Sequence, residues 1–194
     1  MIKVCAPKDC FALVRQDASQ YIISYGYSAE QGKSLATWEE VYVPFKEKWK
    51  ISFKDIRQAI LADIDAQTDE RILNGYEFTP DGADTPIVVW LSRENQTNFS
   101  EAQRLAIVPI TFKLNEDEEQ KAIYHTFADF DELDRFYKGG VAYIQQCLQQ
   151  GWARKDAIDW APYRALFPDE QPSTPDDEPP TPDNSQAITP DGQN

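Results

Sequence analysis

Residues 51–91 read ISFKDIRQAILADIDAQTDERILNGYEFTPDGADTPIVVWL, and this stretch decides the fold class. Its first half predicts a helix over residues 51–74, because apolar side chains recur there at helical spacing: Ile56, Ile60, Leu61 and Ile64. Ser52 is a suitable N-cap, and Asp55 three positions later favours the exposed amides of the first turn.

The second half of this stretch predicts a β-hairpin. Asn74-Gly75 is predicted to end the helix, because Gly tolerates the left-handed conformation there. Residues 76–79 and 87–91 are rich in aromatic and β-branched side chains, and Pro80–Asp84 between them has strong turn chemistry. Thr68–Arg71 leaves open whether the preceding helix is continuous or divided in two.

The chain after this hairpin repeats the pattern of a helix followed by two strands. Ser92 is predicted to cap a helix with an inner face made of Phe99, Ala102, Leu105 and Ala106. Residues 108–114 and 121–127 are predicted to pair as a second hairpin around the charged loop 115–120.

A long final helix is predicted from Asp129, which forms a capping-box-like start with Glu132. Its buried stripe is expected to comprise Phe130, Leu133, Tyr137, Val141, Ile144 and Leu148. Gly139-Gly140 inside it indicates a kink or a close contact with a neighbouring backbone, and Gly151 is predicted to end it. The aromatic segment 152–167 is expected to fold back on the core.

Residues 1–50 are predicted to form a small antiparallel β unit, with strands near residues 1–5, 11–15, 21–27 and 37–44. The predicted fold is therefore α+β. The β unit is followed over residues 51–167 by an α-β-β-α-β-β-α layer with antiparallel strands, and residues 168–194 form a disordered acidic tail.

Half of the net charge of −14 lies in that tail, which has seven acids from Asp169 onward and no Lys or Arg, leaving −14 + 7 = −7 for the body. A negative body repels phosphate, so we expect neither nucleic acid nor an anionic membrane as a partner. Thr-Pro-Asp occurs three times in the tail, which acts either as a motif read by a partner or as a solubilising, self-repelling end.

No apolar run has the length of a membrane span, and the N-terminus lacks the apolar region of a signal peptide, so we expect a protein of the cytoplasm. Cys5, Cys10 and Cys147 are an odd set of three without a common zinc spacing. We therefore expect no disulfide framework, no metal site and no cofactor.

We also expect no catalytic residues. His125 is the single histidine, it lies in a predicted strand, and no recognisable nucleophile motif accompanies it. Carboxylate pairs such as Asp63 with Asp65 are typical of a solvated helix face. An enzyme remains the alternative if acids converge on His125 in a cleft.

Aromatic side chains give the candidate protein interface: Tyr25, Tyr27, Trp38, Tyr42 and Trp49. For the tyrosines, the alternative is that they pack one side of a sheet and keep their hydroxyl groups in water. For Trp49, which lies in a charged connector, the alternative is packing of the linker onto a neighbouring domain.

Two short signatures carry a family resemblance: IDAQTDERILNGYEF at residues 64–78 and VWLSRENQ at residues 89–96. With the hairpin that ends at residues 125–127 and the final helix, residues 55–159 resemble a domain of unknown function encoded by phages and prophages near tail and tail-fibre genes. Residues 11–30 also look like the starts of such proteins from gut-bacterial phages.

The resemblance implies a non-enzymatic phage or prophage accessory protein, a structural or adaptor module associated with the tail or virion. Its partner would be a tail or virion component or a second copy of the chain, and the virion would be a second location besides the cytoplasm of the producing cell. The alternative is an acidic inhibitor or immunity-type protein that blocks a basic partner.

Overall fold

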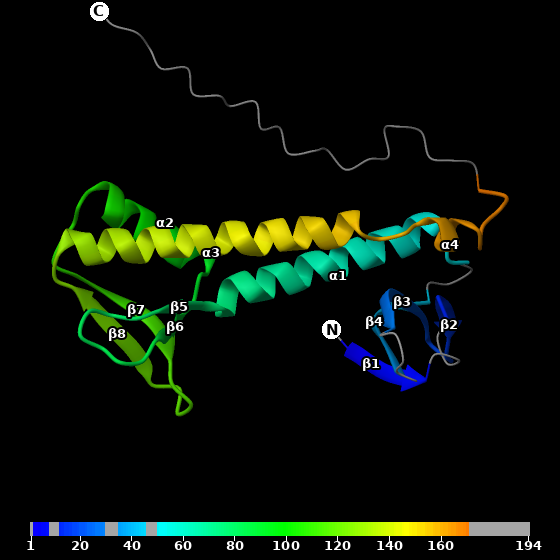
Figure 1. Cartoon of the computed structure of the whole chain (residues 1–194), viewed down its shortest axis with the longest axis horizontal. Coiled ribbons are helices and arrows are strands. Elements are labelled where there is room, and N and C mark those ends of the chain that lie inside the picture. The colour runs from blue at the N-terminus through cyan, green and yellow to red at the C-terminus, as the bar shows by residue number, and fades with distance from the viewer. Residues whose placement is uncertain (1, 8–11, 30–34, 46–49, 171–194) are drawn as a thin grey trace, which may run out of the picture.

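The chain forms an elongated molecule in which two long helices join a small β-sheet at one end to an α+β lobe at the other (Figure 1). The computed structural model describes residues 2–7, 12–29, 35–45 and 50–170. The long helices are α1 (Phe53–Asn74) and α3 (Phe130–Asp156), and they lie side by side along most of their length. The predicted α+β class with antiparallel strands is confirmed.

The N-terminal sheet has four antiparallel strands in the order β1-β4-β3-β2. Their bounds are β1 Ile2–Pro7, β2 Val14–Gln16, β3 Gln20–Ala29 and β4 Leu35–Pro44. The pairing of β3 with β4 shifts register between Tyr25 and Ser28, where Gly26 has a φ of +63°. Glycine adopts this left-handed conformation without the steric penalty that other residues meet.

The lobe at the other end contains two antiparallel hairpins and a short helix. The bounds are β5 Tyr76–Phe78, β6 Ile87–Val89, α2 Arg93–Arg104, β7 Ile110–Glu116 and β8 Ala122–Phe127. Both predicted hairpins are confirmed, and the Trp90 amide joins them by donating to the Leu114 carbonyl at 2.8 Å. A short helix, α4 (Ala161–Arg164), follows α3.

Helix α1 begins as the sequence predicts. The Ser52 hydroxyl accepts a hydrogen bond from the Asp55 amide at 3.2 Å, and the Asp55 carboxylate accepts one from the Ser52 amide at 3.0 Å. This reciprocal capping box satisfies two amides that lack a partner within the helix. The helix continues without a break through residues 68–71, which resolves the alternative that the sequence left open.

Gly75 follows α1, but the predicted reason for a glycine there is wrong. Its φ of −118° lies outside the left-handed region. A Cβ at this position would lie 1.9 Å from the hydroxyl oxygen of Tyr143 and 2.8 Å from the Arg71 carbonyl oxygen. Tyr143 donates to that same carbonyl at 2.9 Å, so the glycine makes room for a side chain from α3.

Within the described residues, buried side chains form two hydrophobic clusters. One fills the lobe between its hairpins, α2 and the first half of α3. The other lies between the N-terminal sheet, α1 and α4, and its members are Ile23, Tyr25, Ile56, Ile60, Ile64 and Tyr163. Among the described residues, this second cluster therefore combines side chains from both sides of position 50.

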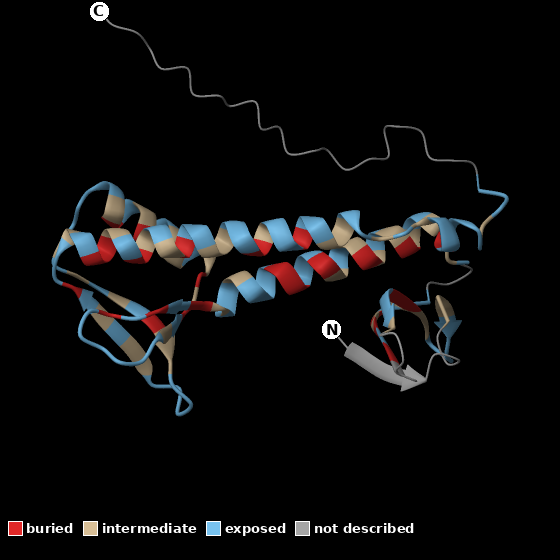
Figure 2. Cartoon of the chain, in the orientation of Figure 1, coloured by how far each residue is buried: buried red, intermediate tan, exposed pale blue. Residues whose placement is uncertain are grey.

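The buried face of α3 differs from the predicted stripe. Its buried apolar positions are Leu133, Phe136, Gly140, Cys147 and Gly151, and Figure 2 shows the buried positions mostly along the edge that faces α1. Val141, which was predicted to be buried, is 40% exposed, and Tyr137, Ile144 and Leu148 are half-buried. The small residues face inward because they allow close contact with neighbouring elements.

Glycines within α3 show this close contact. A Cβ at Gly151 would lie 2.6 Å from the hydroxyl oxygen of Thr68 on α1, and one at Gly139 would lie 2.5 Å from that of Tyr76. The prediction that Gly151 ends the helix is therefore wrong, since α3 continues to Asp156. Gly139-Gly140 marks contact with a side chain rather than with the predicted neighbouring backbone.

Two smaller predictions also need correction. Helix α2 ends at Arg104, so Leu105 is not on its inner face but 53% exposed, and Ala106 beside it is exposed as well. Trp152 and Leu166 are each 48% exposed, whereas Tyr163 of the same predicted segment is buried against the sheet. The predicted disorder of the acidic tail concerns residues that, from 171 onward, lie outside the described part of the chain.

Candidate functional site

The structure divides the predicted aromatic interface. Tyr25 and Trp38 are 2% and 3% exposed, so they are not available at the surface, and their assignment to the interface is corrected. Tyr27 and Tyr42 are 43% and 36% exposed, while Trp49 lies outside the described residues. Strand alternation would place Tyr25 and Tyr27 on one face, but the irregularity at Gly26 breaks that alternation.

Tyr25 belongs to a polar network where the N-terminal sheet meets the two long helices. Its hydroxyl donates to Asp63, and Gln67 donates to Tyr25 and to Asp63 at 2.9 Å each. Arg154 then bonds to Gln67 at 2.8 Å and to Glu39 at 2.7 Å. Burial, and next the hydrogen bond to Asp63, raise the pKa of Tyr25, so its phenol stays protonated.

A polar cleft of about 560 Å³ lies beside this network. Its lining includes Arg71 and Arg154 together with Glu39 and Glu70. Both cations already have partners within the chain, because Arg71 bonds to Gln150 at 2.6 Å and Arg154 pairs with Glu39. Because both arginines are engaged within the chain, the cleft is typical of a contact between structural elements and not of a binding site for a charged ligand.

His125 has one carboxylate beside it. Its Nε2 lies 3.0 Å from Oε1 of Glu132, which also accepts a hydrogen bond from the Asp81 amide at 3.0 Å. The rings of Phe78 and Phe127 contact the imidazole on its other sides. In the described part of the chain, the imidazole thus has no hydroxyl or thiol at bonding distance that it could activate.

This arrangement holds the Pro80–Asp84 loop against the start of α3. Asp129 caps that helix by accepting from the Glu132 amide at 2.9 Å, as the sequence predicts. The Glu132 carboxylate does not complete the capping box, because it faces His125 and Asp81 instead. Arg135 adds an exposed ion pair to Asp81 at 2.8 Å.

The described residues contain neither a group of metal-binding side chains nor a membrane-spanning helix. No three His, Cys, Asp or Glu side chains among them lie close enough together to hold a metal ion. None of the helices in this part of the chain combines the length and the apolar character that crossing a membrane requires.

An apolar groove of about 360 Å³ lies between α2 and α3. Leu91, Phe99 and Phe136 contribute buried apolar surface to it, and the rings of Phe99 and Phe136 meet edge to face with centroids 4.8 Å apart. The Ser92 hydroxyl fixes the start of α2 by accepting from the Asn95 amide at 3.2 Å. The remaining lining residues are Tyr76, Arg93, Gln96, Thr97, Ser100, Glu101, Tyr137, Gly140, Val141 and Ile144.

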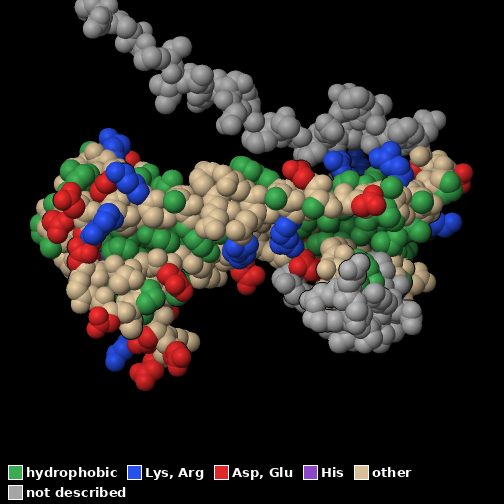
Figure 3. Space-filling view, viewed as in Figure 1, with side chains coloured by type: hydrophobic (Ala, Val, Ile, Leu, Met, Phe, Trp, Pro, Cys, Tyr) green, Lys and Arg blue, Asp and Glu red, His purple; other side chains and the backbone are tan. Residues whose placement is uncertain are grey.

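The apolar surface continues from this groove along α3. We use the name apolar strip for five residues of α3 that share one helix face: Tyr137, Val141, Ile144, Leu148 and Trp152. Val141 is 40% exposed and Trp152 48%, and the other three are half-buried. Figure 3 shows hydrophobic side chains at the surface along the two long helices, interspersed with acidic and basic ones.

Comparison with protein families gives a match to DUF4376, a domain of unknown function, over residues 55–177, which is more than half of the chain. The chain belongs to this family. The DUF4376 match begins in the first turn of α1 and includes both hairpins, α2, α3 and α4, whereas β1–β4 precede it. Comparison with curated proteins and with solved structures gives no match.

The groove and the apolar strip therefore lie entirely within the DUF4376 domain, whereas exposed Tyr27 and Tyr42 lie before it. The predicted resemblance of residues 55–159 to a domain of unknown function is confirmed. The groove was not predicted, because helical spacing assigns Tyr137, Val141, Ile144 and Leu148 to the buried stripe of α3. The available signal was the second row of small residues on α3, at Gly140, Cys147 and Gly151.

Proposed function

We propose that this chain is a non-enzymatic accessory protein of a phage or prophage, a structural or adaptor module that binds another protein through the α2–α3 groove and the apolar strip. It would act in the cytoplasm of the producing cell and in the virion. The apolar strip carries the proposal. In the described chain it leaves Val141 and Trp152 partly exposed, at 40% and 48%, next to an open groove with Phe99 in its lining.

Burial of such a surface is favourable, at about 25 cal/mol per Å² of apolar area removed from water. Contiguous exposed apolar surface that is bordered by polar residues is typical of protein-binding sites. The groove has this border, because Arg93, Gln96 and Glu101 of α2 line its other side. The resemblance to phage domains near tail genes supports a tail or virion component as the partner.

Direct capture with a matched pair of variants tests the proposal. The full chain would be immobilised and offered each purified tail or virion protein encoded by neighbouring genes. Val141→Asp places a charge on the apolar strip, whereas Ala142→Asp places the same charge at the next exposed position, off the strip. We expect Val141→Asp to weaken capture at least about tenfold, which corresponds to about 1.4 kcal/mol, and Ala142→Asp to leave it unchanged.

Capture of none of these proteins, or equal capture by both variants, would contradict the proposal. Far-UV circular dichroism of each variant checks that α3 is intact. An effect of both substitutions on capture with unchanged helix content would place the binding surface elsewhere.

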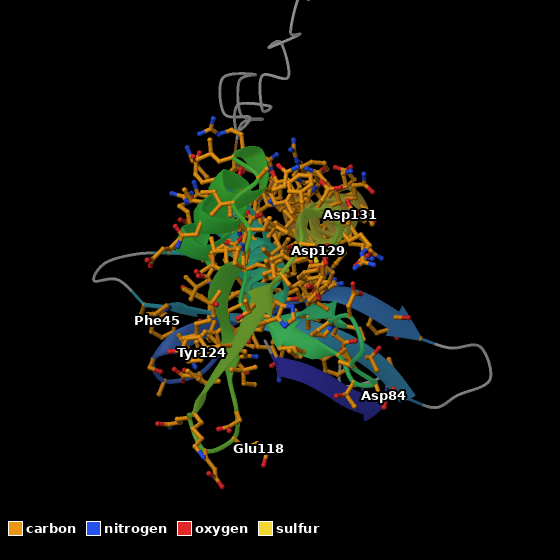
Figure 4. The ribbon with its side chains drawn as sticks, turned by 90° about the vertical axis from the view of Figure 1, so that its left-hand side faces the viewer. Phe45, Asp84, Glu118, Tyr124, Asp129 and Asp131 are labelled. Carbon is orange, nitrogen blue, oxygen red and sulfur yellow. The ribbon has the colours of Figure 1, made fainter. Side chains whose placement is uncertain are left out.

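A second candidate function is an acidic inhibitor that blocks a basic partner. It is favoured by Asp117, Glu118 and Glu119, which are exposed together in the β7–β8 loop, with Glu118 at the tip of the hairpin in Figure 4. The net charge of −14 would speed its association with a cationic protein at low salt. Replacing the three acids by amides should then slow association, and an association rate that is the same at low and high salt would argue against this function.

A further inference from the structure

Four of the five residues of the apolar strip are placed symmetrically in the sequence, and the fifth, Ile144, has Gln145 as its counterpart. Counted from a point midway between residues 144 and 145, Tyr137 and Trp152 lie equally far in opposite directions, and so do Val141 and Leu148. Successive members are separated by four, three, four and four residues. This spacing keeps all five on one face of α3.

From this symmetry we propose that α3 pairs with α3 of a second copy of the chain, antiparallel, about a two-fold axis between Ile144 and Gln145. The inference rests on the proposed binding role of the strip, and it names the partner. In a two-fold contact each residue meets its counterpart in mirrored order, so Val141 would face Leu148 of the second copy and Tyr137 would face its Trp152. The five positions extend over about 22 Å of helix, at 1.5 Å per residue.

The groove fits this arrangement. It lies beside Tyr137, Val141 and Ile144, in the first half of the strip, and Trp152 is the large exposed side chain in the second half. Antiparallel pairing brings the second half of one copy onto the first half of the other. Each Trp152 would then reach the groove of the partner copy, which has Leu91 and Phe99 in its lining, and the contact would be made twice.

Charge selects the antiparallel direction. Asp134 and Lys155 lie on the same face of α3 as the strip and are also equally far from its midpoint. Their side chains are 21% and 25% exposed, and each has a partner in its own chain, Lys138 for Asp134 and Asp65 for Lys155. Antiparallel pairing places each Asp134 near Lys155 of the other copy, whereas parallel pairing would place like charges together.

Sedimentation equilibrium of the full chain tests the proposal. We expect a mass of twice 22.2 kDa for the unmodified chain and for Ala142→Asp, and a mass of 22.2 kDa for Val141→Asp. A monomeric unmodified chain would overturn the pairing. A dimer that Val141→Asp does not dissociate would overturn it as well.

A cross-linking pair tests the position of the axis without requiring that the dimer be broken. Gln145→Cys and Gln146→Cys change adjacent, exposed glutamines, but only position 145 lies at the proposed axis. With a short bismaleimide, and with the unmodified chain as the background for its own cysteines, we expect cross-linked dimer from Gln145→Cys and the background level from Gln146→Cys. Equal cross-linking of both variants would overturn the antiparallel arrangement.

These outcomes separate the two proposals. A monomer that captures a tail or virion protein in a Val141-dependent way keeps the proposed function and removes the pairing. A dimer that captures none of them keeps the pairing and removes the adaptor function.

Discussion

The crossing of α1 and α3 at Thr68 and Gly151 allows a quantitative test of the packing. A Cβ at Gly151 would lie 2.6 Å from Oγ1 of Thr68, 3.3 Å from its Cγ2 and 3.5 Å from its Cβ. The Thr68 hydroxyl is held in place because it donates to the Ile64 carbonyl at 2.8 Å. Gly151→Ala should therefore crowd the oxygen and the methyl group of Thr68, but not its Cβ.

Two opposing effects determine the result. Alanine in place of glycine within a helix stabilises by about 1 kcal/mol. Overpacking of a well-packed contact typically costs about 1–3 kcal/mol. With one contact at 2.6 Å, we expect the overpacking to be larger, so that Gly151→Ala lowers the free energy of unfolding by about 1 kcal/mol.

The same substitution should have the opposite sign in a Thr68→Ala background. Alanine at position 68 removes the two close atoms and leaves the Cβ at 3.5 Å, an ordinary van der Waals separation. Gly151→Ala then retains only its gain in helix propensity, about 1 kcal/mol. The coupling between the two positions is therefore expected to be about 2 kcal/mol.

Urea unfolding of the four proteins of this double-mutant cycle, followed by far-UV circular dichroism, measures the coupling. Ala142→Gly, at an exposed position of the same helix, supplies the propensity effect without the contact. If Gly151→Ala stabilises the chain equally in both backgrounds, the close approach of α1 to α3 at this point is refuted.

Three further results are expected. Ser52→Ala should destabilise the chain by about 1 kcal/mol in urea unfolding, because it removes the capping box of α1, and an unchanged midpoint would contradict this role. Burial raises the pKa of both Tyr76 and Tyr163 to about 12. The stability that these two groups contribute is therefore fully present below the unfolded pKa of about 10 and is lost as the pH rises through 12. Tyr76→Phe should make the urea midpoint decline less steeply between these two pH values, and an identical decline in both proteins would count against this effect. Glu132→Ala should cost about 2 kcal/mol, because a buried carboxylate that accepts two hydrogen bonds is lost. Arg135→Ala should cost less, because its ion pair is exposed to solvent; equal losses of unfolding free energy would contradict this difference.

Features that depend on neighbouring residues in the sequence could be predicted from it. The cap of α1 needs Ser52 and Asp55, and the first hairpin needs two short strands on either side of Pro80–Asp84. Both signals are complete within a few residues, so packing against distant parts of the chain does not override them.

The orientation of α3 could not be predicted in this way. Two rows at helical spacing compete on it, one of large apolar residues and one that includes Gly140, Cys147 and Gly151. The large side chains of the first row predict that this row is buried. The second row is buried instead, because the neighbouring elements approach α3 closely only where its side chains are small. A glycine that admits a neighbouring side chain cannot be distinguished from a glycine that ends a helix until the neighbour is known. Gly151 was predicted to end α3, but it lies within the helix and admits Thr68.

The candidate site was missed for the same reason. Once α3 is turned toward its row of small residues, Val141 is exposed, and Tyr137 and Ile144 line the groove while they still pack against the core of the lobe. The assignment of Tyr25 to the predicted aromatic interface was wrong for a different reason. Tyr25 and Tyr27 are separated by a local irregularity at Gly26, which simple strand alternation does not anticipate.

The unbroken course of α1 has a mechanical consequence. Its 22 residues span about 33 Å, and its two ends are anchored in different hydrophobic clusters, at Ile56 near the start and Ile72 near the finish. The length of the helix thus sets the distance between the four-stranded sheet and the hairpin lobe. A change in this spacing would therefore require α1 to bend or one of its ends to leave its cluster.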